Sequence, residues 1–280
     1  MQYVGKVVLP EGKKVAVNLG FDFDAFSVWM ETFKQSSQAY MSRGEYGAEV
    51  GVPRILDLLK KYDIEASFCV PGHTADSYPD ICKEIIKEGH EILHHGYVHE
   101  DPTFLPIEEE EKILVKGLEA LEKLGVKPIG YRSPGFDLSP NTLNLLKKHG
   151  IKYDSSLMGN DFYPYHPRVC EVNYDKGNVF GEPLSIVEMP VTWYLDDFPH
   201  LEFIGTRTGM KPPSQVFEIW KMYFDYAVEN TENGMMVVTM HPQVIGRPHN
   251  IIMLEQFINY VLERGGWITS LRNIYKSVEF

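Results

Sequence analysis

Four of the ten histidines in this 280-residue chain fall within residues 90–99. Two of them, His95 and His99, are four residues apart, a spacing that puts both side chains on one face of a helical turn. Upstream, Asp22 and Asp24 follow an apolar run with strand-like alternation, so both carboxylates leave that strand on one side. One carboxylate and two imidazoles form a metal-ligand set that leaves coordination positions free for water and substrate. The pattern therefore predicts a metal-dependent hydrolase.

Each of these groups also has a simpler interpretation. A histidine pair at this spacing on a surface helix usually binds nothing. Aspartates that follow a strand often serve as turn residues or helix caps. Both groups, however, come directly after predicted strands, where α/β proteins collect their functional residues. Their joint setting favours the metal site.

Strand-like and helix-like segments alternate along the chain, which indicates an α/β fold. The predicted strands are 15–21, 65–70, 91–94, 129–132, 152–154, 186–192, 235–241 and 267–269, and the predicted helices are 50–62, 78–88, 107–124, 140–149, 215–230 and 252–265. Because polar groups follow successive strands, we favour a parallel barrel over a doubly wound sheet. No repeat or linker divides the chain, so residues 1–280 are expected to form a single catalytic domain.

The composition excludes several classes of partner. A net charge of −12 and a pI near 5.3 argue against nucleic acid and anionic membranes. The chain contains no apolar stretch of membrane-spanning length, and its first residues show no secretory signal. Three cysteines without a Cys-x-x-Cys spacing indicate no disulfide framework. We therefore expect a cytoplasmic protein that acts on a small molecule.

The segments that follow the predicted strands resemble, in order, the motifs of the polysaccharide deacetylase family. The matching segments are Gly89–Ile92 with His95–His99 for the histidine element, 132–135 (Arg-Ser-Pro-Gly) for the Arg-x-Pro element, 154–156 for an Asp-x-x-Ser-like element, and 237–242 for the last histidine element. Gly96 departs from the usual Ser or Thr. The resemblance covers about residues 15 to 270. It implies a distorted (β/α) barrel, here of about seven parallel strands.

This resemblance implies roles for the carboxylates and the histidine pair. Asp24, His95 and His99 would hold one divalent ion, and zinc suits their donor set best. Phe23 stands where most family members carry the catalytic base. Asp22, on the same strand face, could stand in as that base or could instead orient a histidine.

Further roles are expected at the later strand ends. His241 would donate a proton to the leaving nitrogen, because the pKa of imidazole lies near neutrality. Arg132 would pair with Asp22, or form a purely structural salt bridge. Asp154 could orient His241 or cap a helix. Pro134, beside Arg132, is expected to contact the substrate.

Two aromatic segments are expected to cover this site. Residues 25–49, with Trp29 and Tyr46, are too many for a simple strand-to-helix turn, and Trp193 and Asp196 lie in a second such segment. Long aromatic loops are lids or subunit contacts, so a homo-oligomer, a dimer or a tetramer, is expected. A covered pocket with aromatic walls suits a small ring better than a long glycan.

Three functions follow, in order of preference. The first is a metal-dependent hydrolase of non-peptide C–N bonds that opens a small cyclic imide or amide. The second is an N-deacetylase of peptidoglycan or another N-acetylated glycan. The third is a catalytically inactive binding or scaffold protein with the same fold, which the altered first motif and Gly96 would explain.

Overall fold

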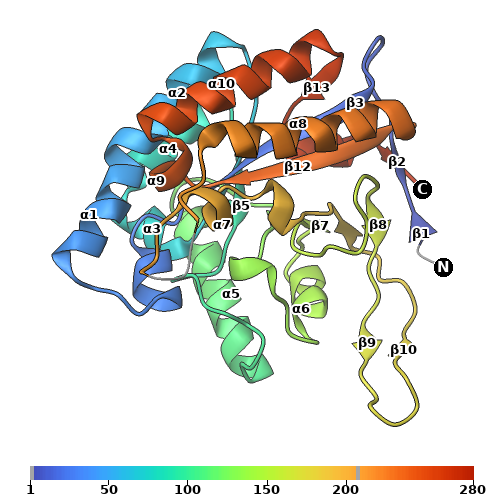
Figure 1. The fold of residues 1–280 in the computed structure, drawn as a ribbon. Coiled ribbons are helices and arrows are strands. Elements are labelled where there is room, and N and C mark those ends of the chain that lie inside the picture. The colour runs from blue at the N-terminus through green and yellow to red at the C-terminus, as the bar shows by residue number, and fades with distance from the viewer. Residues whose placement is uncertain (1–2, 206–208) are drawn as a thin grey trace.

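The main sheet curls into a barrel that helices surround (Figure 1). The computed structural model describes residues 3–205 and 209–280. The strands in these ranges are β1 (Tyr3–Val4), β2 (Lys6–Val7), β3 (Val15–Asp22), β4 (Ser67–Val70), β5 (Glu91–His94), β6 (Gly130–Tyr131), β7 (Tyr153–Asp154), β8 (Tyr165–His166), β9 (Cys170–Glu171), β10 (Val179–Phe180), β11 (Val187–Glu188), β12 (Gly234–Met240), β13 (Gly266–Ile268) and β14 (Val278–Glu279).

The order of strands confirms the predicted distorted (β/α) barrel. The described part of the main sheet runs β1-β8-β11-β7-β6-β5-β4-β3-β12, with β13 paired to β3. The path from β11 to β12 contains seven strands and is parallel throughout. Only β1 and β8 join this sheet in antiparallel pairs.

Helices follow most of the parallel strands and cover the outside of the barrel (Figure 1). They are α1 (Gln38–Tyr46), α2 (Val52–Lys61), α3 (Gly72–Ser77), α4 (Pro79–Lys87), α5 (Ile107–Glu122), α6 (Thr142–Lys148), α7 (Phe198–Leu201), α8 (Pro213–Asn230), α9 (Pro242–Ile245), α10 (Pro248–Glu263) and α11 (Leu271–Lys276), with short π or 3-10 turns η1 (Val28–Thr32), η2 (Gly47–Gly51), η3 (Pro134–Phe136) and η4 (Trp193–Leu195). Among the described residues, no helix is both long enough and apolar enough to cross a bilayer.

Strand β3 separates two cores because its side chains alternate between them. Val17 and Leu19 pack with buried side chains of α2, α8 and α10. Ala16 belongs instead to the cluster inside the barrel, which includes residues of β4, β5, β7 and β12. Asp22, an even number of residues further on, therefore projects on the same side as Ala16, at the carboxyl end of the barrel.

The barrel is distorted because β3 has two partners along one edge. β12 pairs with β3 from Val15 to Phe21, while β13 pairs only with its first three residues and β4 only with its last three. Asn18 stands at this division and donates from Nδ2 to Ser67 Oγ and to Thr269 O, each at 3.0 Å. The buried amide thus ties the two diverging strands to β3.

Between β11 and β12 the barrel is almost open. Within the described residues, the segment after β11 meets β12 through one isolated parallel bridge, Asp196 to Thr239. This bridge brings the residues that follow β11 beside the end of β12.

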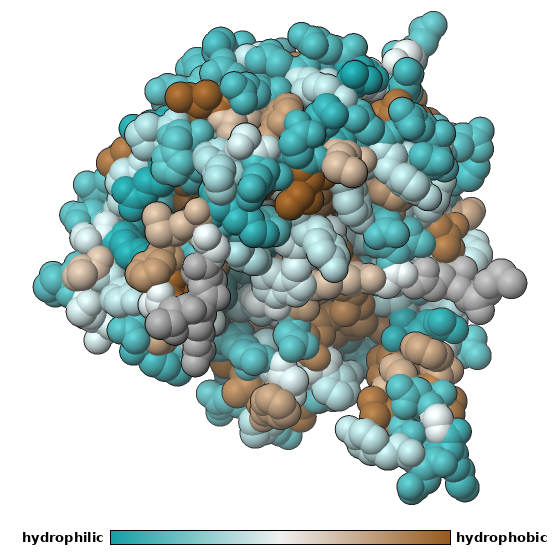
Figure 2. Space-filling model, in the orientation of Figure 1, coloured by the Kyte–Doolittle hydropathy of each residue, from teal (hydrophilic) through white to brown (hydrophobic). Residues whose placement is uncertain are grey.

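A hairpin of β9 and β10 extends from the body, and the sequence patterns did not predict it (Figure 1). Several of its apolar side chains are exposed, Tyr174 and Phe180 among them. On the face in Figure 2, hydrophobic residues form separate patches within a mostly hydrophilic surface.

Candidate functional site

The two aspartates stand where β3 ends. Asp22 is the last residue of the strand, and Phe23 N–H continues the ladder by donating to Cys69 O at 2.8 Å. Ala25 then takes a positive φ of 49°, which turns the chain away from the barrel. Both carboxylates are buried, with Asp22 3% and Asp24 0% exposed. The apolar strand thus carries two acidic groups into a protected position, as the sequence predicted.

The histidine segment after β5 is a loop and not the helical turn that the sequence spacing suggested. Gly96 and His99 both have positive φ, 71° and 73°. The Glu100 carboxylate closes this loop by accepting the N–H groups of Tyr97 at 2.9 Å and Val98 at 2.8 Å. The expectation of a helix was wrong, yet His95 and His99 still converge, with ring centroids 5.0 Å apart.

Asp24, His95 and His99 bring three ligand atoms together. Asp24 Oδ1 lies 3.4 Å from His95 Nε2 and 3.8 Å from His99 Nε2. One ligand atom from each residue fits within 4.8 Å of the others. Both oxygens of Asp24 and Nε2 of His95 are buried without a hydrogen-bond partner in the structure. Buried polar atoms without partners are costly, so these residues fit a cation well.

Nδ1 of His95 and Nδ1 of His99 also have hydrogen-bond partners. His95 Nδ1 donates to the backbone oxygen of Arg132 at 2.7 Å, and His99 Nδ1 lies 2.6 Å from Thr32 Oγ1. Burial lowers the pKa of His99 to about 4, which keeps this ring neutral, as a metal ligand must be. Burial also acts to lower the pKa of His95, but Asp22 and Asp24 outweigh it and raise that pKa. A cation at Nε2 of His95 would satisfy the same carboxylates.

Asp22 forms a buried ion pair with Arg132, as expected. Arg132 Nη1 donates to Asp22 Oδ1 at 2.7 Å, and its Nε donates to Ser155 O at 3.1 Å. Burial favours the neutral acid, but Arg132 and His95 outweigh it and lower the pKa of Asp22 to about 2. The guanidinium crosses over Gly20, where a Cβ would lie 2.9 Å from Nη1. The fold therefore keeps an ionised carboxylate beside the three ligand residues.

His241 lies at the end of β12 and is held by Asp197. Its Nδ1 is 2.8 Å from Asp197 Oδ1, and its backbone N–H donates to the same carboxylate at 3.1 Å. Its Nε2 lies 3.8 Å from Asp24 Oδ2. Burial acts to lower the pKa of His241, but Asp196 and Asp197 raise it well above 6.5. A protonated imidazole thus faces the candidate metal site.

Sequence analysis proposed Asp154 as the partner that orients His241, and this was wrong. Asp154 Oδ1 accepts a hydrogen bond from Ser156 Oγ at 2.7 Å, and Glu188 stands opposite Asp154 on the neighbouring strand. Asp197 takes the expected role because the bridge between Asp196 and β12 brings it to the end of that strand. A pair of adjacent acidic residues after an aromatic segment was the available sequence signal.

A cavity of about 100 Å³ opens beside these groups. It is lined by Asp22, Val28, Thr32, Phe33, His99, Gly135, Phe136, Trp193, Asp196, Phe198 and His241. Of the expected substrate contacts, Trp193 and Asp196 therefore line it.

The other three expected substrate contacts lie outside this lining. Trp29 is fully buried and packs behind the wall, against Phe33 and Phe198. Tyr46 donates to Gly246 O at 3.0 Å. Pro134 begins η3, and the next two residues, Gly135 and Phe136, line the cavity instead.

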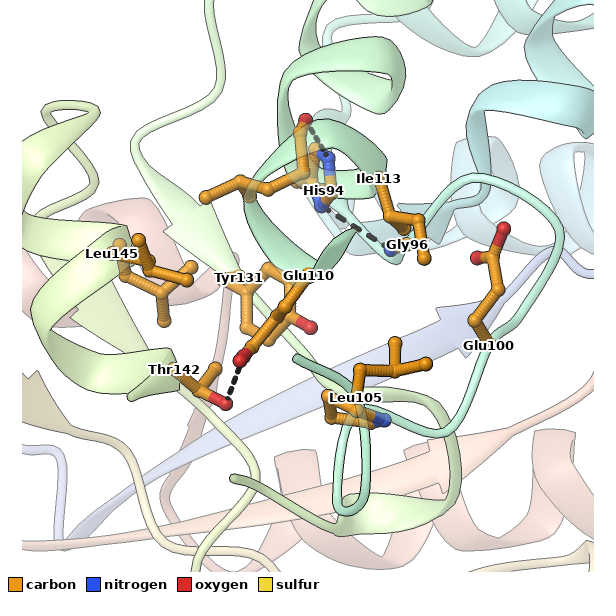
Figure 3. A pocket seen from close by; sticks show the side chains of 12 residues that line it. His94, Gly96, Glu100, Leu105, Glu110, Ile113, Tyr131, Thr142 and Leu145 are labelled. Carbon is orange, nitrogen blue, oxygen red and sulfur yellow. Dashed lines mark hydrogen bonds between the residues drawn. The ribbon is translucent and has the colours of Figure 1, made fainter. Parts of the chain in front are cut away.

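A second, smaller pocket shows how the histidine loop is anchored (Figure 3). His94 Nε2 donates to Leu114 O at 3.0 Å, and its Nδ1 accepts from Gly96 N–H at 3.2 Å. Burial lowers the pKa of His94 to about 4. Gly117 of α5 leaves room for this ring, since a Cβ there would lie 2.3 Å from Nε2. His94 thus fixes the loop to α5 and supplies no ligand atom to the ion.

Comparisons with known proteins identify the family of this chain. The polysaccharide deacetylase family model matches residues 41–153. A protein named peptidoglycan deacetylase from Helicobacter pylori is 36% identical over 275 residues, which cover 92% of this chain and 94% of that protein. The chain belongs to the polysaccharide deacetylase family.

Two solved structures share the whole fold of this chain. A Mycobacterium smegmatis protein classed with the polysaccharide deacetylases is 34% identical, with a TM-score of 0.85, and the match covers 99% of this chain and 94% of that one. The Puue allantoinase is 24% identical, with a TM-score of 0.78, and the match covers 96% of this chain and 91% of the allantoinase chain. This match shows likeness of fold alone. The protein is therefore a hydrolase of the deacetylase family.

Proposed function

We propose that the protein removes acetyl groups from N-acetylated sugars of the peptidoglycan type, with a divalent ion at Asp24, His95 and His99. The observation that carries the proposal is that the Asp22 carboxylate and the His241 imidazole both lie next to this ligand set. Asp22 Oδ2 is 3.9 Å from His95 Nε2, and His241 Nε2 is 3.8 Å from Asp24 Oδ2. Similarity to the Helicobacter pylori protein supports this substrate class over the cyclic imide that we preferred from the sequence. Zinc is the ion we expect, because it suits two imidazoles and one carboxylate.

The chain supplies both proton transfers that amide hydrolysis requires. A divalent ion would polarise the substrate carbonyl and lower the pKa of a water molecule. Asp22 is placed to accept a proton from that water, and Arg132 keeps its carboxylate ionised and oriented. His241 is placed to donate a proton to the leaving nitrogen, and Asp197 keeps its ring protonated and oriented.

A second candidate is the opening of a small cyclic imide. The specific observation in its favour is the small cavity of about 100 Å³, whose walls include Phe33, Trp193 and Phe198. Ligand pockets are lined mainly by hydrophobic and aromatic side chains, and aromatic walls this close together suit a compact ring. The same two proton transfers would serve this reaction.

Substrate assays separate these candidates. We would measure acetate release from N-acetylglucosamine oligomers and peptidoglycan fragments by the zinc-loaded protein, and ring opening of succinimide, hydantoin and dihydropyrimidines in parallel. We expect acetate release, and the His95→Ala variant, which lacks a ligand, should show none. Ring opening without acetate release would replace our proposal by the second candidate. Stoichiometric zinc without turnover of any of these compounds would contradict both.

A further inference from the structure

The two histidine ligands differ in what holds their second ring nitrogen. His95 Nδ1 meets a backbone carbonyl oxygen, which can only accept a hydrogen bond. His99 Nδ1 meets the hydroxyl of Thr32 at 2.6 Å, and a hydroxyl can accept or donate. Thr32 belongs to η1, within the insert that follows β3, and not to a strand end. The insert therefore contacts a candidate metal ligand directly.

Ion binding would fix the direction of this hydrogen bond. A neutral imidazole that binds an ion through Nε2 carries its one ring hydrogen on Nδ1. Thr32 Oγ1 must then accept from His99, so the hydroxyl hydrogen is free to turn elsewhere. Thr32 is exposed and lines the cavity.

The position of this hydroxyl is set by the buried part of the insert. Trp29, in the same turn as Thr32, is fully buried and packs against Phe33 and Phe198. The Arg43 guanidinium stacks over its ring, 4.0 Å from the centroid, and donates to Glu202 Oε1 at 2.5 Å. Side chains that are locked by packing hold a functional group in place better than a free loop does.

We propose that Thr32 is a positioning residue whose hydroxyl accepts a hydrogen bond from His99 Nδ1 and so holds Nε2 of this ring toward Asp24 and His95. This role rests on the ligand set of the proposed function and not on which substrate the protein hydrolyses.

Two variants test this proposal with a readout that needs no turnover. Thr32→Val keeps the side-chain shape and removes the hydroxyl, while Thr32→Ser keeps the hydroxyl. We would measure zinc affinity by competition with a chromophoric chelator. Loss of a hydrogen bond to a metal-binding histidine should weaken zinc binding about tenfold in Thr32→Val.

Controls separate the hydroxyl from general packing. Thr32→Ser should bind zinc within about twofold of the unchanged protein, since it retains the hydroxyl acceptor. Thr231→Val is the matched control, because that hydroxyl donates to Ala227 O at 2.6 Å, at the end of α8. Equal zinc affinity in the unchanged protein and in Thr32→Val would overturn the orienting role. Equal losses of zinc affinity in Thr32→Val and Thr32→Ser would overturn it as well. If zinc binds to the unchanged protein but no N-acetylated sugar is hydrolysed, the proposed function fails while the role of Thr32 stands.

Discussion

Replacing Asp22 by asparagine separates the catalytic and structural roles of this carboxylate. Its pKa is lowered from 3.8 to about 2, although burial alone would raise it, because Arg132 and His95 stabilise the anion. A pKa that is lower in the folded state gives stability that is present above pH 3.8 and is lost as the pH falls toward 2. The difference corresponds to about 2 to 3 kcal/mol at neutral pH. Asparagine removes this and leaves Arg132 buried without its partner, so we expect a loss of about 3 to 5 kcal/mol in unfolding free energy.

The catalytic loss should be measurable separately from this structural cost and should leave the metal in place. Asp22 contributes no ligand atom to the Asp24–His95–His99 group. Asp22→Asn should therefore bind zinc near stoichiometry and turn over about 100-fold or more slowly, the scale for losing a general base. The assay pairs zinc content with acetate release below the melting temperature of the variant. Asp137→Asn is the matched control, since that carboxylate is exposed and contacts only the next N–H at 2.9 Å.

Two results would refute this reasoning. Turnover within a few-fold of the unchanged protein, with zinc bound and the fold intact, would mean that Asp22 only orients a neighbour. Loss of zinc in Asp22→Asn with retention in Asp24→Asn would exchange the roles of the two aspartates.

The remaining predictions concern the ligand set, the proton donor, the loop anchor and the assembly. Asp24→Asn should weaken zinc binding at least about tenfold in a chelator competition, because an anionic ligand is lost. Unchanged zinc affinity would exclude Asp24 as a ligand. Asp197→Asn removes one of the carboxylates that raise the pKa of His241, so that pKa should fall. The alkaline limb of the pH–rate profile should then move to lower pH, and an unmoved limb would contradict His241 as the proton donor. Gly117→Ala should lower the unfolding free energy by about 1 to 3 kcal/mol in denaturant titrations, since its Cβ would meet the buried ring of His94. The control Gly181→Ala, whose Cβ would have an ordinary contact at 3.5 Å, should change the unfolding free energy by less than about 0.5 kcal/mol. The homo-oligomer stays a prediction, and a monomer mass by light scattering at micromolar concentration would show it to be wrong.

The strand ends were predictable because their chemistry is local in sequence. Apolar alternation placed a strand at 15–21 with acidic residues after it, and β3 ends at Asp22. The run before His241 was similarly clear, and β12 ends at Met240. Parallel strands bring such ends to one rim, so Asp24 and the histidine pair could be grouped without a structure.

The partners of these groups could not be predicted, because tertiary contacts decide them. Asp197 reaches His241 through a bridge between distant segments, and nothing near either residue encodes this pairing. Thr32 contacts His99 because an irregular insert folds over the rim. The spacing of His95 and His99 also led to the wrong prediction of a helical turn. The two rings meet instead because the backbone bends in a loop with positive φ at Gly96.

The pairing of β3 has a consequence for how the chain folds during synthesis. Val15 pairs with both Gly234 and Gly266, so β3 leaves the ribosome long before two of its neighbours exist. An apolar strand with unpaired edges is prone to aggregation, and contacts this distant in sequence form slowly. The nascent chain should therefore depend on chaperones until its last strands dock. Because His241 follows β12, the complete proton-transfer machinery can assemble only in that final step.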